Sequence, residues 1–447
     1  MEKVRYWDPK VELMSVEEMR KLQLKRLKAV LNYVYERSAF YRRKFDQAGV
    51  KPDDLKTLED LRKFPFTVKD DLREYGYPHG GDFRCVPMDA TPYFHCTSGT
   101  TGKPTVMYYT EKDKGTWEDL GARSLTAAGV RKGDIMLNCY GYGLFTGGLG
   151  FHYAGIRVGA VVIPWSVGRT EAMIQALKDF KVTVLTGTPS YEYYIGEVIG
   201  KMGLDPVKDL YLRVALPGAE TWTEDMRRRI EESLGLKAHG GGAVNCYGLA
   251  EMGGPFVGME CVYEKGVHLW VDSYYVEVID PETGEALEPE EEGELVFTNM
   301  AYEGMPIIRY RTRDITKLIV DPCECGRKAF PRFPRIVGRT DDSFSYKGTK
   351  IFPSAVHEAV MKFPEVQEFQ IVVDKTVMPY TMVIRVEVPK DKQTPELKER
   401  IERELDRTLF VAPPVEIVDV GVLPRFEGKA KRVIFKEPAK PEELKIR

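Results

Sequence analysis

The spacing of apolar residues changes along the chain, and each spacing predicts a different kind of element. Near the N-terminus, apolar residues recur at helical intervals, at Leu22, Leu27, Val30 and Val34. Ser15 stands three residues before Glu18, which is the spacing of a capping box at a helix start. The pattern predicts an amphipathic helix over residues 15–40.

From Asp134 onward, short apolar runs alternate with amphipathic stretches. The runs have the length of single buried strands and cover Ile135–Cys139, Ala160–Pro164, Val182–Leu185, Leu212–Leu216 and Ala243–Cys246. Between them, Thr170–Phe180 and Thr223–Leu234 have helical spacing. This alternation favours a largely parallel sheet covered by helices.

After Tyr263 the runs become shorter and alternate between apolar and polar residues. They predict half-buried strands at Glu277–Ile279, Glu294–Thr298 and Ile315–Val320. We expect a small β subdomain here.

A last segment begins near Asp341. It predicts, in chain order, a helix, two strands, a helix and a strand: Ser354–Phe363, Phe369–Val373, Met382–Val388, Pro395–Leu409 and Val415–Val422. About 100 residues suffice for a compact domain. The predicted fold class is therefore α/β. We expect an N-terminal domain of layered sheets plus the small β subdomain in residues 1–340, and an α/β C-terminal domain in residues 341–447.

Composition narrows the class of protein. Of the 447 residues, 43% are hydrophobic and 30% are charged, which is typical of a soluble globular protein. The net charge of −3 predicts no binding to nucleic acid or to a membrane surface. No signal peptide or membrane span is apparent, and seven unevenly spaced cysteines favour the reducing cytoplasm.

The strongest local motif is a loop rich in glycine and hydroxyl groups. It consists of Thr97, Ser98, Gly99, Thr100, Thr101, Gly102, Lys103 and Pro104. Two glycines allow a tight turn whose N–H groups converge on an anion, and Lys103 adds positive charge. The loop favours binding of a nucleotide polyphosphate over the alternative, a flexible polar hairpin. It is not a Walker A loop, because Pro104 stands where Ser or Thr would bind magnesium.

This loop resembles the phosphate loop of the adenylate-forming superfamily, which includes acyl-CoA synthetases, luciferases and adenylation domains of peptide synthetases. Further motifs follow in that superfamily's order: Pro217-Gly218-Ala219-Glu220, Asn245-Cys246-Tyr247-Gly248-Leu249-Ala250-Glu251, Tyr310-Arg311-Thr312-Arg313-Asp314, Gly338-Arg339-Thr340-Asp341-Asp342 and Gly428-Lys429. Arg313 stands where the wider superfamily more often has glycine. The resemblance extends from residue 97 to residue 429.

The resemblance implies a nucleotide-binding role for several of these residues. The turn of Gly218, Ala219 and Glu220 is expected to contact adenine, and Tyr247, which precedes Gly248, is expected to lie against the adenine ring. Asp314 is expected to accept hydrogen bonds from both ribose hydroxyls. Arg339 is expected to lie near the nucleotide.

The same resemblance implies the catalytic groups. Glu251 is expected to hold Mg²⁺, and Lys429 to bridge the substrate carboxylate and the α-phosphate of ATP. Both reactants are anions, so positive charge and alignment are what such a site must provide. Asp341 is expected to be the hinge of a mobile C-terminal domain. The alternatives are an ordinary exposed turn at Asp341 and a solvated lysine at position 429.

A narrower resemblance is to phenylacetate–CoA ligases. It rests on Tyr140-Gly141-Tyr142-Gly143-Leu144-Phe145-Thr146-Gly147-Gly148-Leu149-Gly150, on Thr188-Pro189-Ser190-Tyr191 and on Pro306-Ile307-Ile308-Arg309-Tyr310. Tyr140, Tyr142 and Phe145 could form flat apolar walls around an aromatic acid. Packing of these rings in the core is the alternative.

A metal site is also predicted. Cys323 and Cys325 flank Glu324 in a turn, and Cys261 and His268 lie upstream. Three thiolates and an imidazole form a closed tetrahedral set suited to structural zinc. Unbound buried thiols are the alternative.

Together these features predict an aryl acid–CoA ligase that uses ATP, Mg²⁺ and CoA and forms an acyl-adenylate. We expect it in the cytoplasm and as a homodimer. One alternative is an adenylating enzyme that uses a different acid, or an acceptor other than CoA, such as a carrier protein or a deazaflavin cofactor. Another is a catalytically silent nucleotide-binding regulator.

Overall fold

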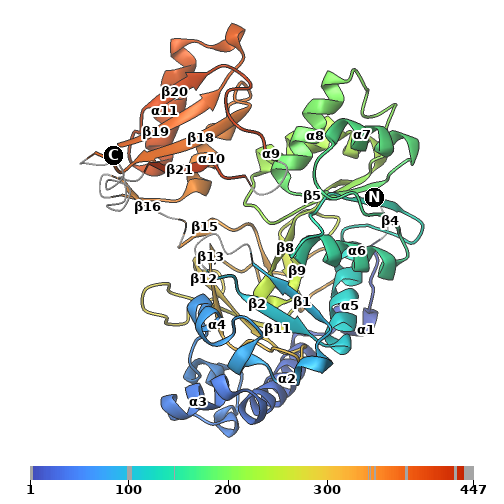
Figure 1. Ribbon diagram of the computed structural model, residues 1–447, viewed down its shortest axis with the longest axis vertical. Coiled ribbons are helices and arrows are strands. Elements are labelled where there is room, and N and C mark those ends of the chain that lie inside the picture. The colour runs from blue at the N-terminus through green and yellow to red at the C-terminus, as the bar shows by residue number, and fades with distance from the viewer. Residues whose placement is uncertain are drawn as a thin grey trace, which may run out of the picture.

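The computed structural model describes residues 4–97, 103–144, 146–340, 342, 344–346, 349–377, 381–426 and 430–436. Figure 1 shows a large body made by the N-terminal three quarters of the chain and, at its upper left, a C-terminal unit in orange. Every helix within the described residues is too short or too polar to span a bilayer.

Four helices form the N-terminal part: α1 (Pro9–Glu12), α2 (Val16–Arg37), α3 (Ala39–Ala48) and α4 (Lys69–Tyr75). The predicted capping box at Ser15 and Glu18 is confirmed. The single helix predicted over residues 15–40 is wrong, because Ser38 has an extended backbone and its hydroxyl caps α3. The chain therefore turns after Arg37 and starts a second helix.

A five-stranded parallel sheet lies at the centre of the next region, as predicted, in the order β4-β3-β5-β6-β7. Its strands are β3 (Ile135–Asn138), β4 (Val161–Ile163), β5 (Val184–Gly187), β6 (Val214–Pro217) and β7 (Gly242–Ala243). The associated helices are α5 (Glu111–Ala127), α6 (Thr146–Val158), α7 (Thr170–Asp179), α8 (Pro189–Lys201) and α9 (Glu224–Leu234). The strand predicted at Ala243–Cys246 is divided, because Cys246 begins a strand of another sheet.

Antiparallel strands form the β-rich part. A hairpin joins β1 (Tyr93–Cys96) to β2 (Val106–Tyr109). One four-stranded sheet has the order β14-β10-β9-β8 and a second has the order β11-β12-β13-β15. Their strands are β8 (Cys246–Leu249), β9 (Gly254–Met259), β10 (Val267–Leu269), β11 (Tyr274–Ile279), β12 (Gly293–Asn299), β13 (Tyr310–Thr316), β14 (Arg332–Phe333) and β15 (Gly338–Arg339). The strand predicted at Ile315–Val320 begins earlier, at Tyr310, because the ribose-motif segment pairs with β12.

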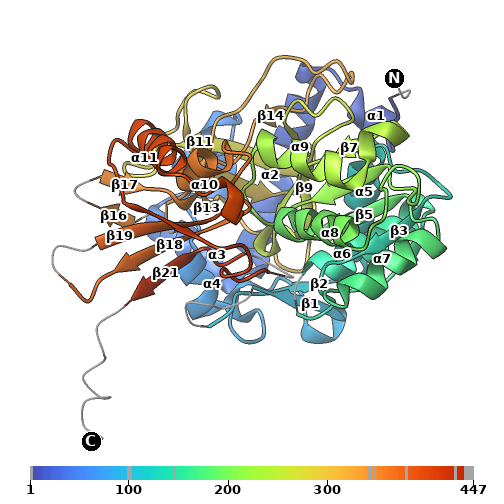
Figure 2. The same ribbon diagram turned by 90° about the horizontal axis from the view of Figure 1, so that it is seen from above.

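The C-terminal unit is mixed α/β, as predicted. A short hairpin of β16 (Phe344–Tyr346) and β17 (Thr349–Ile351) precedes a sheet in the order β20-β19-β18-β21. Its strands are β18 (Glu368–Asp374), β19 (Thr381–Glu387), β20 (Val415–Val418) and β21 (Val433–Lys436), and its helices are α10 (Pro353–Met361) and α11 (Pro395–Leu409). In Figure 2 the helices α10 and α11 lie together over one face of this sheet.

Buried polar contacts tie the start of the chain to segments far along it. The Arg327 guanidinium pairs with the Glu12 carboxylate at 2.6 Å, and both side chains are fully buried. The Tyr6 hydroxyl donates to the Cys325 carbonyl at 2.7 Å. The loop between β13 and β14 is thus held against the N-terminal segment.

Candidate nucleotide site and cysteine–histidine centre

The hairpin β1–β2 presents the glycine-rich loop. At its base, Thr97 Oγ1 accepts hydrogen bonds from the Thr105 backbone N–H and from the Thr105 hydroxyl, both at 3.1 Å. Lys103 places its ammonium group 5.7 Å from the centre of the Tyr77 ring. Ser98, Gly99, Thr100, Thr101 and Gly102 lie outside the described residues.

Glu251 lies beside the base of this loop. It sits in a single 3₁₀ turn between β8 and β9 and is 4% exposed. Its Oε1 accepts from the Tyr310 hydroxyl at 3.0 Å and from the Thr105 hydroxyl at 3.3 Å, and the Lys69 ammonium lies 3.7 Å away. Burial, and then the Glu251 charge, raise the pKa of Tyr310 well above its usual range.

Sequence reasoning missed three partners of Glu251. Thr105, Lys69 and Tyr310 were not singled out as site residues. Thr105 directly precedes β2, Lys69 begins α4 and Tyr310 begins β13. These segments are far apart in the chain, so only the fold brings them together. The position of Tyr310 in the motif that ends at Asp314 was the one available signal.

A second cluster joins three predicted nucleotide residues. The Tyr247 hydroxyl donates to Asp314 Oδ2 at 2.6 Å, and Arg339 donates to Asp314 Oδ1 at 2.9 Å. The register of β13 with β15 places Asp314 opposite Arg339. Burial and the Asp314 carboxylate raise the pKa of Tyr247 well above its usual range. The structure therefore brings an aromatic ring, an acid and a guanidinium to one place.

The turn after β6 closes against β8. Ala219 has a left-handed backbone with φ of 70°, and a Cβ on Gly218 would lie 2.8 Å from the Cys246 carbonyl oxygen. Gly248 is similarly confined, since a Cβ there would lie 2.0 Å from the Gly254 carbonyl oxygen. Glycine is required where two backbones approach this closely.

Glu220 ends this turn, and its carboxylate contacts α8 and the C-terminal unit. Its Oε2 accepts from the Ser190 hydroxyl at 2.6 Å, and its Oε1 accepts from the Ala430 backbone N–H at 2.6 Å. The turn thus touches the residue that follows Lys429. Asp341 and Lys429 themselves lie outside the described residues.

Two of the predicted pocket aromatics lie within the described residues, and one of them, Tyr140, lies next to the turn. Tyr140 stacks on Phe151 with ring centres 4.9 Å apart, and its hydroxyl donates to the Leu216 carbonyl at 3.3 Å. The Tyr142 hydroxyl lies 2.9 Å from Asn138 Nδ2. Both rings are half-buried. Phe145 lies outside the described residues.

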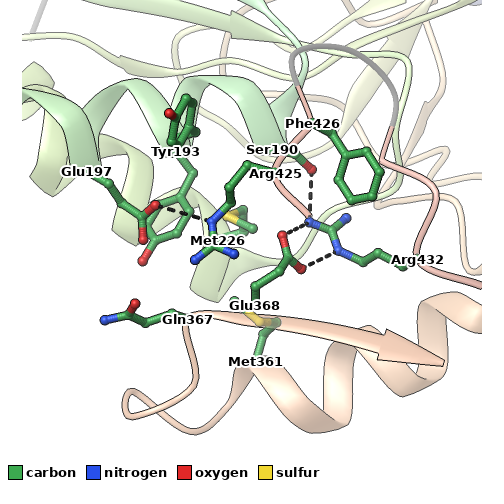
Figure 3. A pocket seen from close by; sticks show the side chains of 11 residues that line it. Ser190, Tyr193, Glu197, Met226, Met361, Gln367, Glu368, Arg425, Phe426 and Arg432 are labelled. Carbon is green, nitrogen blue, oxygen red and sulfur yellow. Dashed lines mark hydrogen bonds and ion pairs between the residues drawn. The ribbon is translucent and has the colours of Figure 1, made fainter. Parts of the chain in front are cut away.

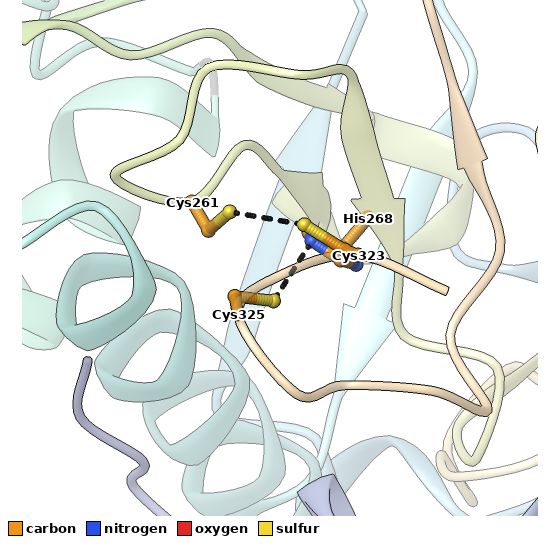
Figure 4. Close-up of side chains that lie close together, drawn as sticks. All are labelled: Cys261, His268, Cys323 and Cys325. Carbon is orange, nitrogen blue, oxygen red and sulfur yellow. Dashed lines mark hydrogen bonds between the residues drawn. The ribbon is translucent and has the colours of Figure 1, made fainter. Parts of the chain in front are cut away.

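Four buried side chains form a separate cluster of metal-ligating atoms. The ligand atoms of Cys261, His268, Cys323 and Cys325 all lie within 4.8 Å of one another. Figure 4 shows the contacts between Cys261 Sγ and Cys323 Sγ, at 3.7 Å, and between Cys325 Sγ and His268 Nε2, at 3.4 Å. Zinc–sulfur bonds of about 2.3 Å in a tetrahedron place two sulfurs about 3.8 Å apart. The donor set and its spacing fit zinc.

The second nitrogen of the histidine supports this arrangement. His268 Nδ1 lies 3.4 Å from the Phe330 carbonyl oxygen. A ligand histidine is usually held by such a contact through its other ring nitrogen. Nε2 is left to face the three sulfurs.

A small pocket lies between α8 and β18, and none of the residues that line it is a predicted nucleotide residue (Figure 3). Its walls include Ser190 and Glu197 from α8 and Glu368 from β18. Arg432 bridges the two sides, with 3.1 Å to Ser190 Oγ and 2.7 Å to Glu368 Oε1. The pocket therefore marks a contact between the C-terminal unit and the rest of the molecule.

Comparisons with known proteins decide the family. The AMP-binding enzyme model matches residues 13–301, and the model of the AMP-binding enzyme C-terminal domain matches residues 348–436. A phenylacetate–coenzyme A ligase of Aromatoleum evansii is 43% identical over 438 residues, which cover 96% of this chain and 97% of that protein. This chain belongs to the phenylacetate–coenzyme A ligase family of AMP-binding enzymes.

The fold of this phenylacetate–coenzyme A ligase family member matches the solved states of one related ligase to different degrees. A 2-hydroxyisobutyryl-CoA ligase in the postadenylation state, with an acyl-AMP bound, is 29% identical and has a TM-score of 0.89. The same ligase in its thioesterification state, with acyl-AMP and CoA, is 30% identical and has a TM-score of 0.71. Each match covers 96% of this chain and 92% of the other. The arrangement of this family member resembles the postadenylation state more closely.

Proposed function

We propose that the protein is an ATP-dependent, AMP-forming acid–CoA ligase whose substrate is phenylacetate or a closely related aromatic acid. The observation that carries the proposal is the Tyr247–Asp314–Arg339 cluster beside Glu251, in a chain 43% identical to a phenylacetate–coenzyme A ligase. Two half-buried rings support an aromatic acid: Tyr140, which lies next to the turn at Gly218, and Tyr142.

Different residues would bind the ribose, the adenine and the phosphates of the nucleotide. Asp314 offers carboxylate oxygens to the ribose, and Tyr247 offers a ring face to adenine. Thr97, Lys103 and the residues between them would receive the phosphates. Glu251, a buried carboxylate next to this loop, is a suitable ligand for Mg²⁺, which would screen the phosphate charge when bound.

The reaction would proceed in two steps. First, a carboxylate oxygen of the acid attacks the α-phosphorus of ATP, and the bond to the β-phosphate oxygen breaks, giving acyl-AMP and pyrophosphate. Second, the CoA thiolate attacks the acyl carbon, and the bond to AMP breaks, giving the thioester. We propose that the C-terminal domain rotates about Asp341 between the steps. Lys429 would therefore stabilise the negative charge on the reacting carboxylate and α-phosphate in the first step alone.

For the cysteine–histidine centre we propose a structural zinc ion, about one per chain. The centre has four protein ligands, which leaves no position for a substrate. A homodimer and a cytoplasmic location remain predictions from the sequence.

The proposal is tested by AMP release from MgATP and CoA across aryl and short aliphatic acids. We expect strong, CoA-dependent turnover with phenylacetate or a close relative. Activity with aliphatic acids only would exclude the aryl pocket. Pyrophosphate exchange without CoA-dependent turnover would indicate another acceptor, and no activity with any acid would favour the regulator or the cofactor-adenylylating enzyme.

Lys429→Ala tests the catalytic assignment. We expect it to slow adenylation by ~10²–10³ and to leave the attack of CoA on preformed acyl-AMP within a fewfold of wild type. Equal losses in both half-reactions would contradict the rotation model.

A further inference from the structure

An arginine of the N-terminal part caps a helix of the C-terminal unit. Arg229 lies on α9 and donates to three backbone carbonyls: Val366 at 2.9 Å, Met361 at 3.0 Å and Phe363 at 3.0 Å. Met361 is the last residue of α10. The last carbonyls of a helix have no partner within the helix and carry partial negative charge, so a guanidinium is well matched to them.

The geometry of the guanidinium matters for this contact. Arginine has a planar fork with five N–H donors, whereas lysine presents a single ammonium group. Arg229 uses two nitrogens, Nη1 and Nη2, to reach the three carbonyls. The side chain is half-buried, so water competes with the contact less than at an open surface.

A second attachment lies at the start of α8. The Glu220 carboxylate accepts from the Ser190 backbone N–H at 3.3 Å and from its hydroxyl at 2.6 Å, and its other oxygen accepts from the Ala430 N–H at 2.6 Å. Arg432 joins Ser190 to Glu368 in the same place (Figure 3). The segment that directly follows Lys429 is thus fixed to the nucleotide turn.

Both attachments depend on how the two parts of the molecule are arranged. The related 2-hydroxyisobutyryl-CoA ligase has been solved in more than one arrangement, and this chain matches the postadenylation structure at a TM-score of 0.89 and the thioesterification structure at 0.71. A contact from α9 to the end of α10 holds only while α10 keeps its present position. Loss of that contact therefore has to shift the balance toward other arrangements.

We propose that Arg229 is a positioning residue for adenylation: by capping α10 it holds the C-terminal unit where the segment at Ala430 reaches the turn at Glu220. The inference rests on the proposed function, because it assigns Arg229 to one of the two half-reactions. The three carbonyls that accept from Arg229 belong to none of the predicted nucleotide residues. Its effect should fall on the rate of adenylation more than on the binding of ATP.

The kinetic test compares Arg229→Ala with Arg228→Ala. Arg228 is the neighbouring exposed arginine, and it pairs with Asp225 on the same helix. For Arg229→Ala we expect a 10-fold to 100-fold lower kcat for acid-dependent ATP–pyrophosphate exchange, a KM for ATP within twofold, and CoA attack on preformed acyl-AMP within twofold. Arg228→Ala should match wild type, and Arg229→Lys should recover only part of the loss.

A structural readout keeps the inference separate from the proposed function. Lys208 and Lys390 have exposed side chains, and one lies in each part of the molecule. Spin labels at Lys208→Cys and Lys390→Cys therefore report the distance between the two parts without any substrate. We expect Arg229→Ala to add a second distance population that Arg228→Ala lacks. An unchanged distribution, or equal losses in both half-reactions, would overturn the inference. Absence of exchange in wild type with every acid, together with a shifted distribution, would reject the proposed function and the assignment to adenylation, but would support the role of Arg229 in holding the C-terminal unit.

Discussion

Asp314 shows how one carboxylate is oriented before any ligand arrives. Each of its oxygens has a different partner, the Tyr247 hydroxyl on one side and the Arg339 guanidinium on the other. Hydrogen bonds to a charged group are stronger than those between neutral groups. The side chain is therefore fixed, and nucleotide binding need not order it.

Tyr247→Phe should weaken ATP binding with little effect on the fold. The variant keeps the aromatic ring and removes the hydroxyl that holds Asp314. We expect the KM for ATP to rise about fivefold to tenfold, corresponding to about 1–1.4 kcal/mol. Tyr33→Phe is the control, because the Tyr33 hydroxyl donates to the Glu303 carbonyl away from this cluster. An unchanged KM would show that Tyr247 does not orient Asp314.

His357 should make the protein sensitive to acid. Burial, and then the charges of Arg432, Arg229 and Arg335, lower its pKa to about 3. Below the ordinary histidine pKa of about 6.5, the unfolded chain binds a proton that the folded chain does not, so stability falls as the pH falls toward 3.

The measurement is urea unfolding of wild type and His357→Phe from about pH 7.5 to about pH 4.5, a range that spans the ordinary histidine pKa of about 6.5. The free energy of unfolding of wild type should fall relative to that of the variant by up to about 1.4 kcal/mol per pH unit below that pKa. Parallel pH profiles would mean that His357 is not the group responsible.

At the scale of elements, the proposed zinc centre would explain how an irregular loop keeps one shape. The segment between β13 and β14 supplies Cys323 and Cys325, and β10 supplies His268. A metal that binds the folded loop and not the unfolded chain contributes directly to the free energy of folding.

Cys323→Ser should therefore lose zinc and stability together. We expect the zinc content to fall from about one ion per chain toward none. The free energy of unfolding should decrease by about 4 kcal/mol or more. Cys85→Ser is the matched control, since Cys85 is a buried free thiol outside the cluster. Wild-type protein without zinc after purification in metal-free buffer would reject the site.

The elements that the sequence predicted well are those with regular periodicity. The predicted helix at Pro395–Leu409 is confirmed at both ends, because its apolar residues share one face. Helix α6 was missed, since Gly147, Gly148 and Gly150 have low helix propensity. There the small residues serve packing: a Cβ on Gly150 would lie 2.8 Å from the Trp117 ring.

The site was predictable only where motif order carried the information. Tyr247, Asp314 and Arg339 were expected to serve one nucleotide, and the structure places them within hydrogen-bonding distance. The contacts of Lys69 and Thr105 with Glu251 depend on how distant segments pack, which local spacing does not encode.

At the scale of the whole molecule, the two parts share apolar packing as well as ion pairs. One hydrophobic cluster includes Met226 and Ile230 from α9 together with Val360 and Phe369 from the C-terminal unit. Rotation of the C-terminal unit would have to separate part of this cluster. Polar contacts such as those of Arg229 therefore act together with buried apolar surface. Both determine how the molecule is distributed among different positions of the C-terminal unit.

The buried pair of Glu12 and Arg327 also has a consequence for synthesis on the ribosome. Its two residues lie 315 positions apart. At a synthesis rate of about 5–20 residues per second, Arg327 is made roughly 16–60 s after Glu12. During that interval Glu12 and the helix that carries it lack this permanent neighbour. The nascent chain must therefore keep a partly apolar segment in solution until the Cys323–Arg327 turn arrives to cover it.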